Sequence, residues 1–189
     1  ELENLAAEET NPDVDWNHVK EAFTSIHSEN LTFSYGNTDQ DTILRDLTFT
    51  INRGDFIAIT GESGIGKSTF LKLLLGIYRP AAPALSVRLF SGEAIPLDCG
   101  VRNIISYVPQ GNFLMSGTIR EAIHFWQGST IDEEKLKDAC RIAEAAGFIE
   151  ALELGYDTPL GERGAGLSEG QLQRLAIARA IYSGKPVLL

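Results

Sequence analysis

The sequence predicts an α/β fold, and three observations indicate it. Strand-like segments dominate the first third of the chain, where Ser25–Gly36 and Thr42–Gly61 carry alternating or continuous apolar residues. A glycine-rich turn follows and leads directly into a helix over about Lys67–Leu75, which Gly76 ends. From about residue 113 to 165 the pattern is helical instead. This order of elements predicts a sheet to which helices are added.

Length and charge limit the classes of protein that this chain can represent. With 189 residues it is long enough for about one domain with its own core. The net charge of −10 excludes general nucleic-acid binding, which depends on Lys and Arg neutralising phosphates. No apolar run approaches the ~18 residues that span a bilayer. Any link to a membrane is therefore expected to come through a partner or through another part of a longer protein.

The two cysteines and the three histidines suggest no special chemistry. Cys99 and Cys140 indicate a reducing compartment, and a disulfide between them is the less favoured alternative. His18, His27 and His124 have neither metal-ligand spacing nor a nucleophile as partner. We therefore assign none of these residues to a site.

Three apolar segments are predicted as strands of the sheet. Phe56–Thr60 is apolar without alternation, which is typical of a strand buried on both faces. Ile104–Pro109 is the clearest strand among the short strands and loops of residues 80–110. Val187–Leu189 opens a further apolar strand.

Two helices are predicted between these strands from their capping residues. Thr118 and Glu121 have the spacing of a capping box, in which each side chain bonds the other residue's backbone amide. Asp132 caps the second helix, which we expect to end at Gly147. Its apolar face is expected to consist of Leu136, Ala139, Cys140 and Ala143.

The glycine-rich turn has the pattern G-x-x-x-x-G-K-[ST] between a predicted buried strand and a helix, which is the context of a phosphate-binding loop. Glycines let the backbone approach a phosphate, and the amides and the helix N-terminus favour negative charge. Lys67 supplies a positive charge to the outer phosphates, Ser68 offers a hydroxyl to Mg²⁺, and Thr69 is a further phosphate contact. The predicted triphosphate site consists of Gly61, Glu62, Ser63, Gly64, Ile65, Gly66, Lys67, Ser68 and Thr69.

A second motif, LSEGQLQRLAIARA at Leu167–Ala180, follows about a hundred residues downstream. Ser168 and Gln171 have capping-box spacing, so the residues alone predict a capped helix over about 168–182. A helix N-terminus is also an anion site, to which Ser168 and Gly170 would present hydrogen-bond donors. The capped helix and the anion site need the same helix N-terminus, so the two interpretations are compatible.

This stretch resembles the L-S-G-G-Q signature motif of ATP-binding cassette (ABC) proteins, with Glu169 in place of the first glycine. The resemblance covers about residues 25–189, and residues 81–100 match least well. It implies a P-loop NTPase core of the ABC-ATPase type, with an antiparallel β subdomain and an inserted helical subdomain. The signature residues that would contact an ATP held by a second domain are Leu167, Ser168, Glu169, Gly170 and Gln171.

The resemblance also assigns roles to single residues and divides the chain. Tyr35 falls where the family places an aromatic residue that stacks on adenine, and Gln110 matches the glutamine that contacts Mg²⁺ and the attacking water. Residues 1–24, which are acidic and contain Pro12, are interpreted as a linker after a presumed upstream transmembrane domain. The ATP-binding domain would span residues 25–189, with its core at 25–110 and 166–189 and its helical subdomain at 111–165.

The function implied is that of an exporter's ATPase domain with ATP and Mg²⁺ as ligands, at the cytoplasmic face of the cell membrane. Its partners would be a second ABC domain, paired head to tail, and the transporter's transmembrane domain, which the stretch around Glu162 would contact. In the family, the strand that KPVLL opens continues to a Mg²⁺-binding Asp and a catalytic Glu, with a switch His further on. Because this sequence does not include those residues, we expect the chain to bind ATP but to hydrolyse it very slowly or not at all.

Three alternatives remain on sequence grounds. A soluble ABC ATPase for DNA repair or translation would carry coiled-coil insertions or basic surfaces. A regulatory or structural remnant would bind nucleotide without hydrolysing it. A small P-loop kinase would leave the LSEGQ motif unexplained.

Overall fold

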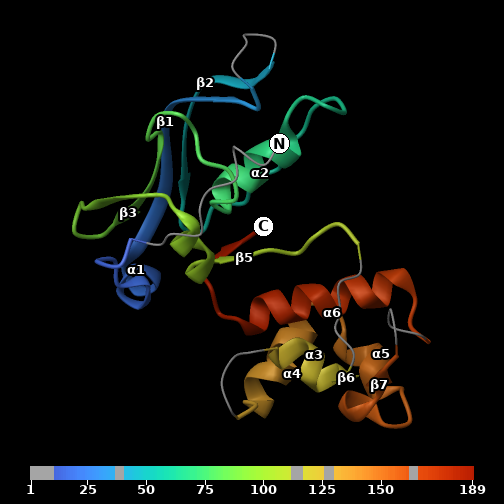
Figure 1. Cartoon of the computed structure of the whole chain (residues 1–189). Coiled ribbons are helices and arrows are strands. Elements are labelled where there is room, and N and C mark those ends of the chain that lie inside the picture. The colour runs from blue at the N-terminus through green and yellow to red at the C-terminus, as the bar shows by residue number, and fades with distance from the viewer. Residues whose placement is uncertain (1–10, 37–40, 112–116, 126–129, 162–165) are drawn as a thin grey trace. The chain divides into compact units, whose positions relative to one another are not determined.

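The structure is a computed structural model that describes residues 11–36, 41–111, 117–125, 130–161 and 166–189. The chain forms two compact units, Glu1–Ile105 and Ser106–Leu189. The first unit is a twisted sheet with helix α2 (Lys67–Leu74) beside it, and the second is a group of helices around α6 (Glu169–Tyr182) (Figure 1).

The sheet of the first unit is antiparallel and has the strand order β2-β1-β3-β4. Its strands are β1 (Phe23–Ser34), β2 (Thr42–Asn52), β3 (Leu85–Leu89) and β4 (Ala94–Pro96). In the centre, Ile26 of β1 lies opposite both Ile51 and Val87. Opposite positions lie on one face of the sheet, where Ile26 and Val87 are buried, as are Leu73 and Leu74 of α2. The antiparallel β subdomain predicted from the sequence is confirmed.

A short helix, α1 (Trp16–Ala22), lies within the segment that the sequence led us to interpret as a linker. Asp15 caps it by accepting bonds from the amides of Asn17 and His18, and Trp16 and Val19 are buried. Trp16 fits against Gly100 so closely that an added Cβ there would lie 2.1 Å from the indole nitrogen. The segment 1–24 thus contains a helix, and its role as a linker stays a prediction. The predicted division into domains remains a prediction.

The segment Phe56–Thr60 corrects the prediction of a buried strand. No strand is assigned at residues 55–60, and Phe56 is 98% exposed, with Ile57 and Ile59 also exposed. An apolar run forms a strand only where a neighbouring strand accepts and donates its backbone hydrogen bonds. Among the residues that the structure describes, none pairs with this segment. The apolar pattern therefore indicates that the segment is suited to a strand. It does not show whether a partner strand is present.

The second unit is mostly helical. Its helices are α3 (Ile119–His124), α4 (Glu133–Ile142), α5 (Ala146–Glu150), the 3-10 helix η4 (Gly155–Asp157) and α6. A short antiparallel pair, β6 (Gly117–Thr118) with β7 (Pro159–Leu160), lies beside them. Leu175 of α6, Ile123 of α3 and Leu136 of α4 are fully buried in one hydrophobic core. Helix α6, predicted to belong to the nucleotide-binding core, thus packs with the helices of this unit.

In this unit two predicted helix N-termini are confirmed, whereas one predicted helix C-terminus is wrong. Thr118 with Glu121 and Ser168 with Gln171 both form complete capping boxes, as predicted. Helix α4 ends at Ile142, where Glu144 takes a left-handed conformation at φ 55°, and Gly147 lies inside α5. The prediction that Gly147 ends this helix is therefore wrong, because a non-glycine residue makes the turn.

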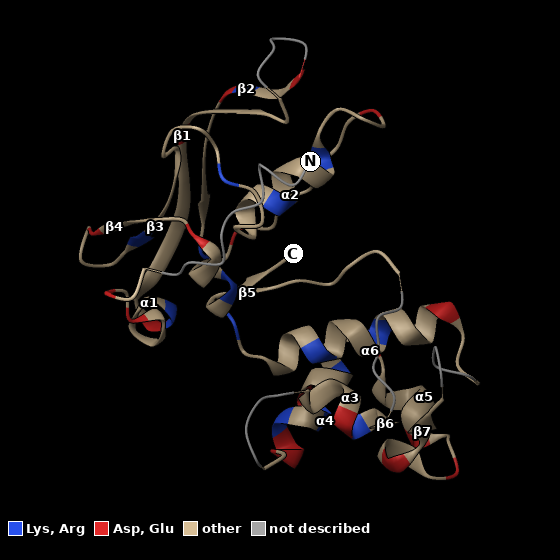
Figure 2. Cartoon of the chain, in the orientation of Figure 1, with Lys and Arg blue, Asp and Glu red and all other residues tan. Residues whose placement is uncertain are grey.

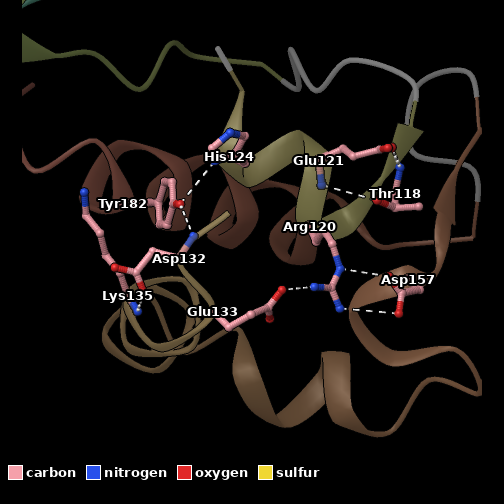
Figure 3. Close-up of polar contacts among 9 residues, drawn as sticks. All are labelled: Thr118, Arg120, Glu121, His124, Asp132, Glu133, Lys135, Asp157 and Tyr182. Atoms are coloured by element: carbon pink, nitrogen blue, oxygen red, sulfur yellow. Dashed lines mark hydrogen bonds and ion pairs between the residues drawn. The ribbon is translucent and has the colours of Figure 1, made fainter. Parts of the chain in front are cut away.

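Polar contacts join the surfaces of these helices (Figure 3). The guanidinium of Arg120 donates to Glu133 and, at 2.8 Å, to Asp157. The Tyr182 hydroxyl accepts from the Asp132 amide at 3.1 Å and bonds Nδ1 of His124 at 3.1 Å. These contacts connect α3, α4, η4 and α6 around the core.

Two very short strands, β5 (Ile105–Ser106) and β8 (Val187–Leu188), pair with each other. The Leu189 amide donates to Ser106 O and the Val108 amide donates to Leu189 O, both at 2.8 Å, which is the pattern of a parallel pair. The strand predicted at Ile104–Pro109 is therefore present but shorter, and the strand predicted at Val187–Leu189 is confirmed. Cys99 and Cys140 are both buried free thiols.

Candidate functional site

The first candidate site is the loop before α2, whose helix begins without a side-chain cap. Gly66 is the N-cap residue at φ 106°, and no side chain bonds the first amides of the helix. Those amides also lack intrahelical acceptors, so they are available to an anion. Gly61 and Gly64 likewise have positive φ, at 148° and 86°. The loop is therefore shaped to direct backbone N–H groups at a ligand.

Lys67 lies at the start of α2 and folds back over this loop. Its ammonium donates to Gly61 O at 2.8 Å and to Glu62 O at 2.7 Å. The positive charge is thus held directly above the glycine turn by neutral carbonyls and not by a carboxylate. In Figure 2 the charged residues of α2 are all basic, although the chain as a whole carries a net charge of −10.

The residues that follow Lys67 differ in their surroundings. Ser68 is exposed, so its hydroxyl can reach a metal ion held by phosphates, whereas Thr69 is only 7% exposed. The Thr69 side chain bonds the hydroxyl of Tyr35 at 2.8 Å. Two residues that the sequence assigned to opposite ends of a nucleotide, 34 positions apart, are therefore in direct contact.

Tyr35 belongs to an aromatic cluster that sequence reasoning missed. Its ring meets Phe33 edge-on at 5.2 Å and Tyr78 edge-on at 5.4 Å, and Phe33 stacks on Tyr78. Lys72 of α2 donates to the Tyr78 hydroxyl at 3.4 Å. Tyr78 follows the end of α2 closely in the chain, and an aromatic residue just after a helix is too weak a signal to find such a cluster.

The remaining loop residues, Glu62, Ser63 and Ile65, are exposed. Ile65 and Lys67 also line an apolar groove of about 530 Å³. Its other walls come from strand β2, from α2 and from the exposed segment 57–60. The loop thus has a polar, amide-rich part and lies beside an apolar groove within the first unit.

The second candidate site is the N-terminus of α6. The Ser168 hydroxyl accepts from the Gln171 amide at 3.3 Å, and Gln171 Oε1 accepts from the Ser168 amide at 2.8 Å. Glu169 and Gly170 are exposed in the first turn, and Leu167 packs against the helical core. This helix start is therefore capped by its own side chains, unlike that of α2.

The other predicted residues lie outside these two sites. Gln110 is exposed just after β5 and belongs to the second unit, as the signature residues do, whereas the loop belongs to the first unit. Glu162 lies outside the described residues. The structure thus brings Tyr35 and residues 61–69 together in one unit and leaves Gln110 and residues 167–171 in the other.

The donor set for a divalent cation in the first unit fits Mg²⁺ bound through phosphates. Mg²⁺ usually keeps several waters and takes only one or two protein ligands beside substrate phosphates. The exposed Ser68 hydroxyl beside Lys67 has the chemistry of such a ligand. Within the described part of the chain, no three His, Cys, Asp or Glu side chains gather as a dedicated metal site.

Comparison with known proteins decides the family. The ABC transporter family model matches residues 44–189. This chain belongs to the ABC transporter family. The ABC-ATPase fold that the signature motif implied is confirmed by a solved structure of a bacterial Atm1-family ABC exporter with ATP bound. That structure has a TM-score of 0.76 and 33% identity over 97% of this chain.

Its relatives in this family include exporters. An ATP-dependent lipid A-core flippase of Coxiella burnetii is 36% identical over 97% of this chain, and a putative multidrug export ATP-binding/permease protein of Staphylococcus aureus is 38% identical over 87%. The chain spans 31% and 28% of the length of these two relatives and 31% of the Atm1-family chain.

In the parts of the chain that the structure describes, no helix combines the length and the apolar character needed to cross a bilayer.

Proposed function

We propose that this chain is the ATP-binding domain of an ABC exporter, which couples ATP binding and hydrolysis to transport across a membrane. The observation that carries the proposal is the uncapped N-terminus of α2, with Lys67 held above it by loop carbonyls. A helix start that has an adjacent ammonium and no side-chain capping bond to its first amides is suited to a polyphosphate. The exporter names among the relatives support the transport role.

In this proposal each residue of the loop has a defined task. The amides of residues 64–69 donate to phosphate oxygens, and Lys67 exchanges its two carbonyl acceptors for them. Ser68 would hold Mg²⁺, which would supply positive charge to the phosphates. Tyr35 contacts the adenine. Water weakens the electrostatic attraction between these groups and an exposed phosphate. The contacts are therefore strongest where the protein largely encloses the ligand.

The partners are a second ABC domain and a transmembrane domain. The N-terminus of α6 would meet an ATP held by the second domain, through the Ser168 hydroxyl and the Gly170 amide. ATP would then bridge two positive helix ends, so its binding would favour closure of the pair. Such a domain would work at the cytoplasmic face of the cell membrane. Its net charge of −10 argues against a nucleic-acid partner.

We expect this chain by itself to bind ATP and to hydrolyse it slowly. Phosphoryl transfer needs a residue that orients the attacking water and acidic ligands that fix Mg²⁺. The described residues offer Gln110 and Ser68 for these tasks and no acidic metal cluster. A steady-state ATPase assay of the chain tests this, and turnover of about 1 s⁻¹ or faster, within the usual range for enzymes, would contradict it.

Equilibrium binding of ATP in the presence of Mg²⁺ tests the proposal itself. Lys67→Met removes a charged contact worth about 1.5–3 kcal/mol, so we expect ATP to bind roughly tenfold to a hundredfold more weakly. Lys137→Met makes the same change of charge at an exposed position of α4 and is the matched control. Equal affinities of the two variants would refute the phosphate site.

A further inference from the structure

The hydrogen bond between Tyr35 and Thr69 connects the end of strand β1 with the first turn of α2. The two oxygens are 2.8 Å apart, and Thr69 is nearly fully buried. Thr69 is the third residue of the helix whose N-terminus forms the phosphate loop. A single hydroxyl–hydroxyl contact therefore joins the residue proposed for the base to the element proposed for the phosphates.

The surroundings of Tyr35 leave this contact to fix the position of its ring. Phe33 and Tyr78 contact the ring edge-on, with interplanar angles of 83° and 89°, and so restrict the rotation of its plane. The hydroxyl oxygen lies on the axis of that rotation, so the bond to Thr69 does not set the plane. The bond instead holds the far end of the side chain in place and so fixes where the ring lies.

One of the two possible directions of the bond leaves a donor over for a phosphate. Each hydroxyl has one hydrogen and two lone pairs. When the Tyr35 hydroxyl donates to Thr69 Oγ1, the Thr69 hydrogen is still available to a further acceptor. The contact is thus compatible with phosphate binding by the same helix, and the base side and the phosphate side of the site can be occupied together.

We propose that Thr69 is a positioning residue for Tyr35, and that the preference of this chain for a nucleotide over a bare triphosphate depends on their hydrogen bond. The inference rests on the proposed function, in which Tyr35 contacts adenine. It adds a specificity role for Thr69, whose side chain the sequence pattern assigned to phosphate. The phosphate loop then contributes to recognition of the base through this one contact.

The test compares ATP with inorganic tripolyphosphate by isothermal titration calorimetry on the whole chain. Tyr35→Phe keeps the ring and loses the bond, and Thr69→Val keeps the shape and loses the hydroxyl. A neutral hydrogen bond is worth about threefold to tenfold in an equilibrium constant. We therefore expect each variant to lower the ratio of ATP affinity to tripolyphosphate affinity by that factor. The ratio cancels any direct loss of a phosphate contact by Thr69.

Two further variants separate positioning from structural damage. Thr69→Ser retains the hydroxyl and should restore the wild-type ratio, while the double variant Y35F/T69V should lose no more than either single one. Thr42→Val removes a comparable hydroxyl contact, to Ser34 at 2.9 Å, one residue from Tyr35. It should leave the ratio unchanged.

The outcomes distinguish the inference from the proposed function. If Tyr35→Ala weakens ATP binding while Y35F and T69V leave the ratio at its wild-type value, the positioning role is refuted and the adenine contact stands. If Tyr35→Ala leaves ATP affinity unchanged, or if the wild-type chain does not bind ATP, the adenine contact fails and the inference fails with it. A loss in T42V equal to that in T69V would also overturn the inference.

Discussion

Replacement of Gly66 by alanine is expected to destabilise the first unit by a specific steric mechanism. The residue has φ 106°, and a Cβ added there would lie 2.5 Å from Ile43 Cγ2. The positive φ costs an L-residue about 1–2 kcal/mol. Forcing the Ile43 methyl aside adds an overpacking cost of about 1–3 kcal/mol. The free energy of unfolding should therefore fall by about 2–5 kcal/mol in G66A.

A matched glycine separates these two costs. Gly54 has φ 91°, and nothing lies within 4 Å of an added Cβ, so G54A carries the conformational cost alone. Ile43→Ala removes the obstructing methyl, and G66A in that background should cost no more than G54A. Urea unfolding can be followed through the buried Trp16 after the second tryptophan is removed by W126F. Equal losses in G66A and G54A would refute the steric argument.

Three further predictions concern the second unit. Leu175→Ala should lower its free energy of unfolding by about 2–5 kcal/mol, measured by urea denaturation, whereas L154A at an exposed position should change it by less than about 0.5 kcal/mol. Ser168→Ala removes half of a capping box and should cost about 0.5–2 kcal/mol in the same assay. Burial raises the pKa of Cys140 from 9.0 to about 11 and that of Tyr156 from 10.0 to about 12. The native state therefore keeps protons that the unfolded chain loses, so stability should fall as pH rises from about 9, less steeply in C140A, and a flat pH profile would contradict this.

The features that the sequence predicted correctly depend on residues close together in the chain. Capping boxes at Thr118 and Ser168 each need only four consecutive residues, and both form as expected. Strand β2 (Thr42–Asn52) follows from its alternation and from the turn after it. Local hydrogen bonding and side-chain periodicity suffice for these elements, because their partners lie within the same segment or the adjacent one.

The predictions that failed depend on distant partners or on unusual conformations. Phe56–Thr60 has the composition of a buried strand, but pairing decides whether such a run becomes one. The turn after helix α4 is made by Glu144 with positive φ, a conformation that is uncommon for residues other than glycine and that no pattern marks. The contact between Tyr35 and Thr69 joins residues 34 positions apart, and only the tertiary fold brings them together.

Both motifs of this chain lie at a helix N-terminus, but one N-terminus lacks a side-chain cap and the other has one. Helix α2 begins at a glycine that cannot cap it, so its first amides are held for a ligand. Helix α6 is capped by Ser168 and Gln171, and Glu169 places an acidic group in its first turn. That acidic group is favourable beside the positive helix end but opposes a phosphate. In a head-to-tail pair the phosphate loop would therefore supply most of the affinity for the triphosphate. The signature helix would contribute chiefly through the donor geometry of Ser168 and Gly170.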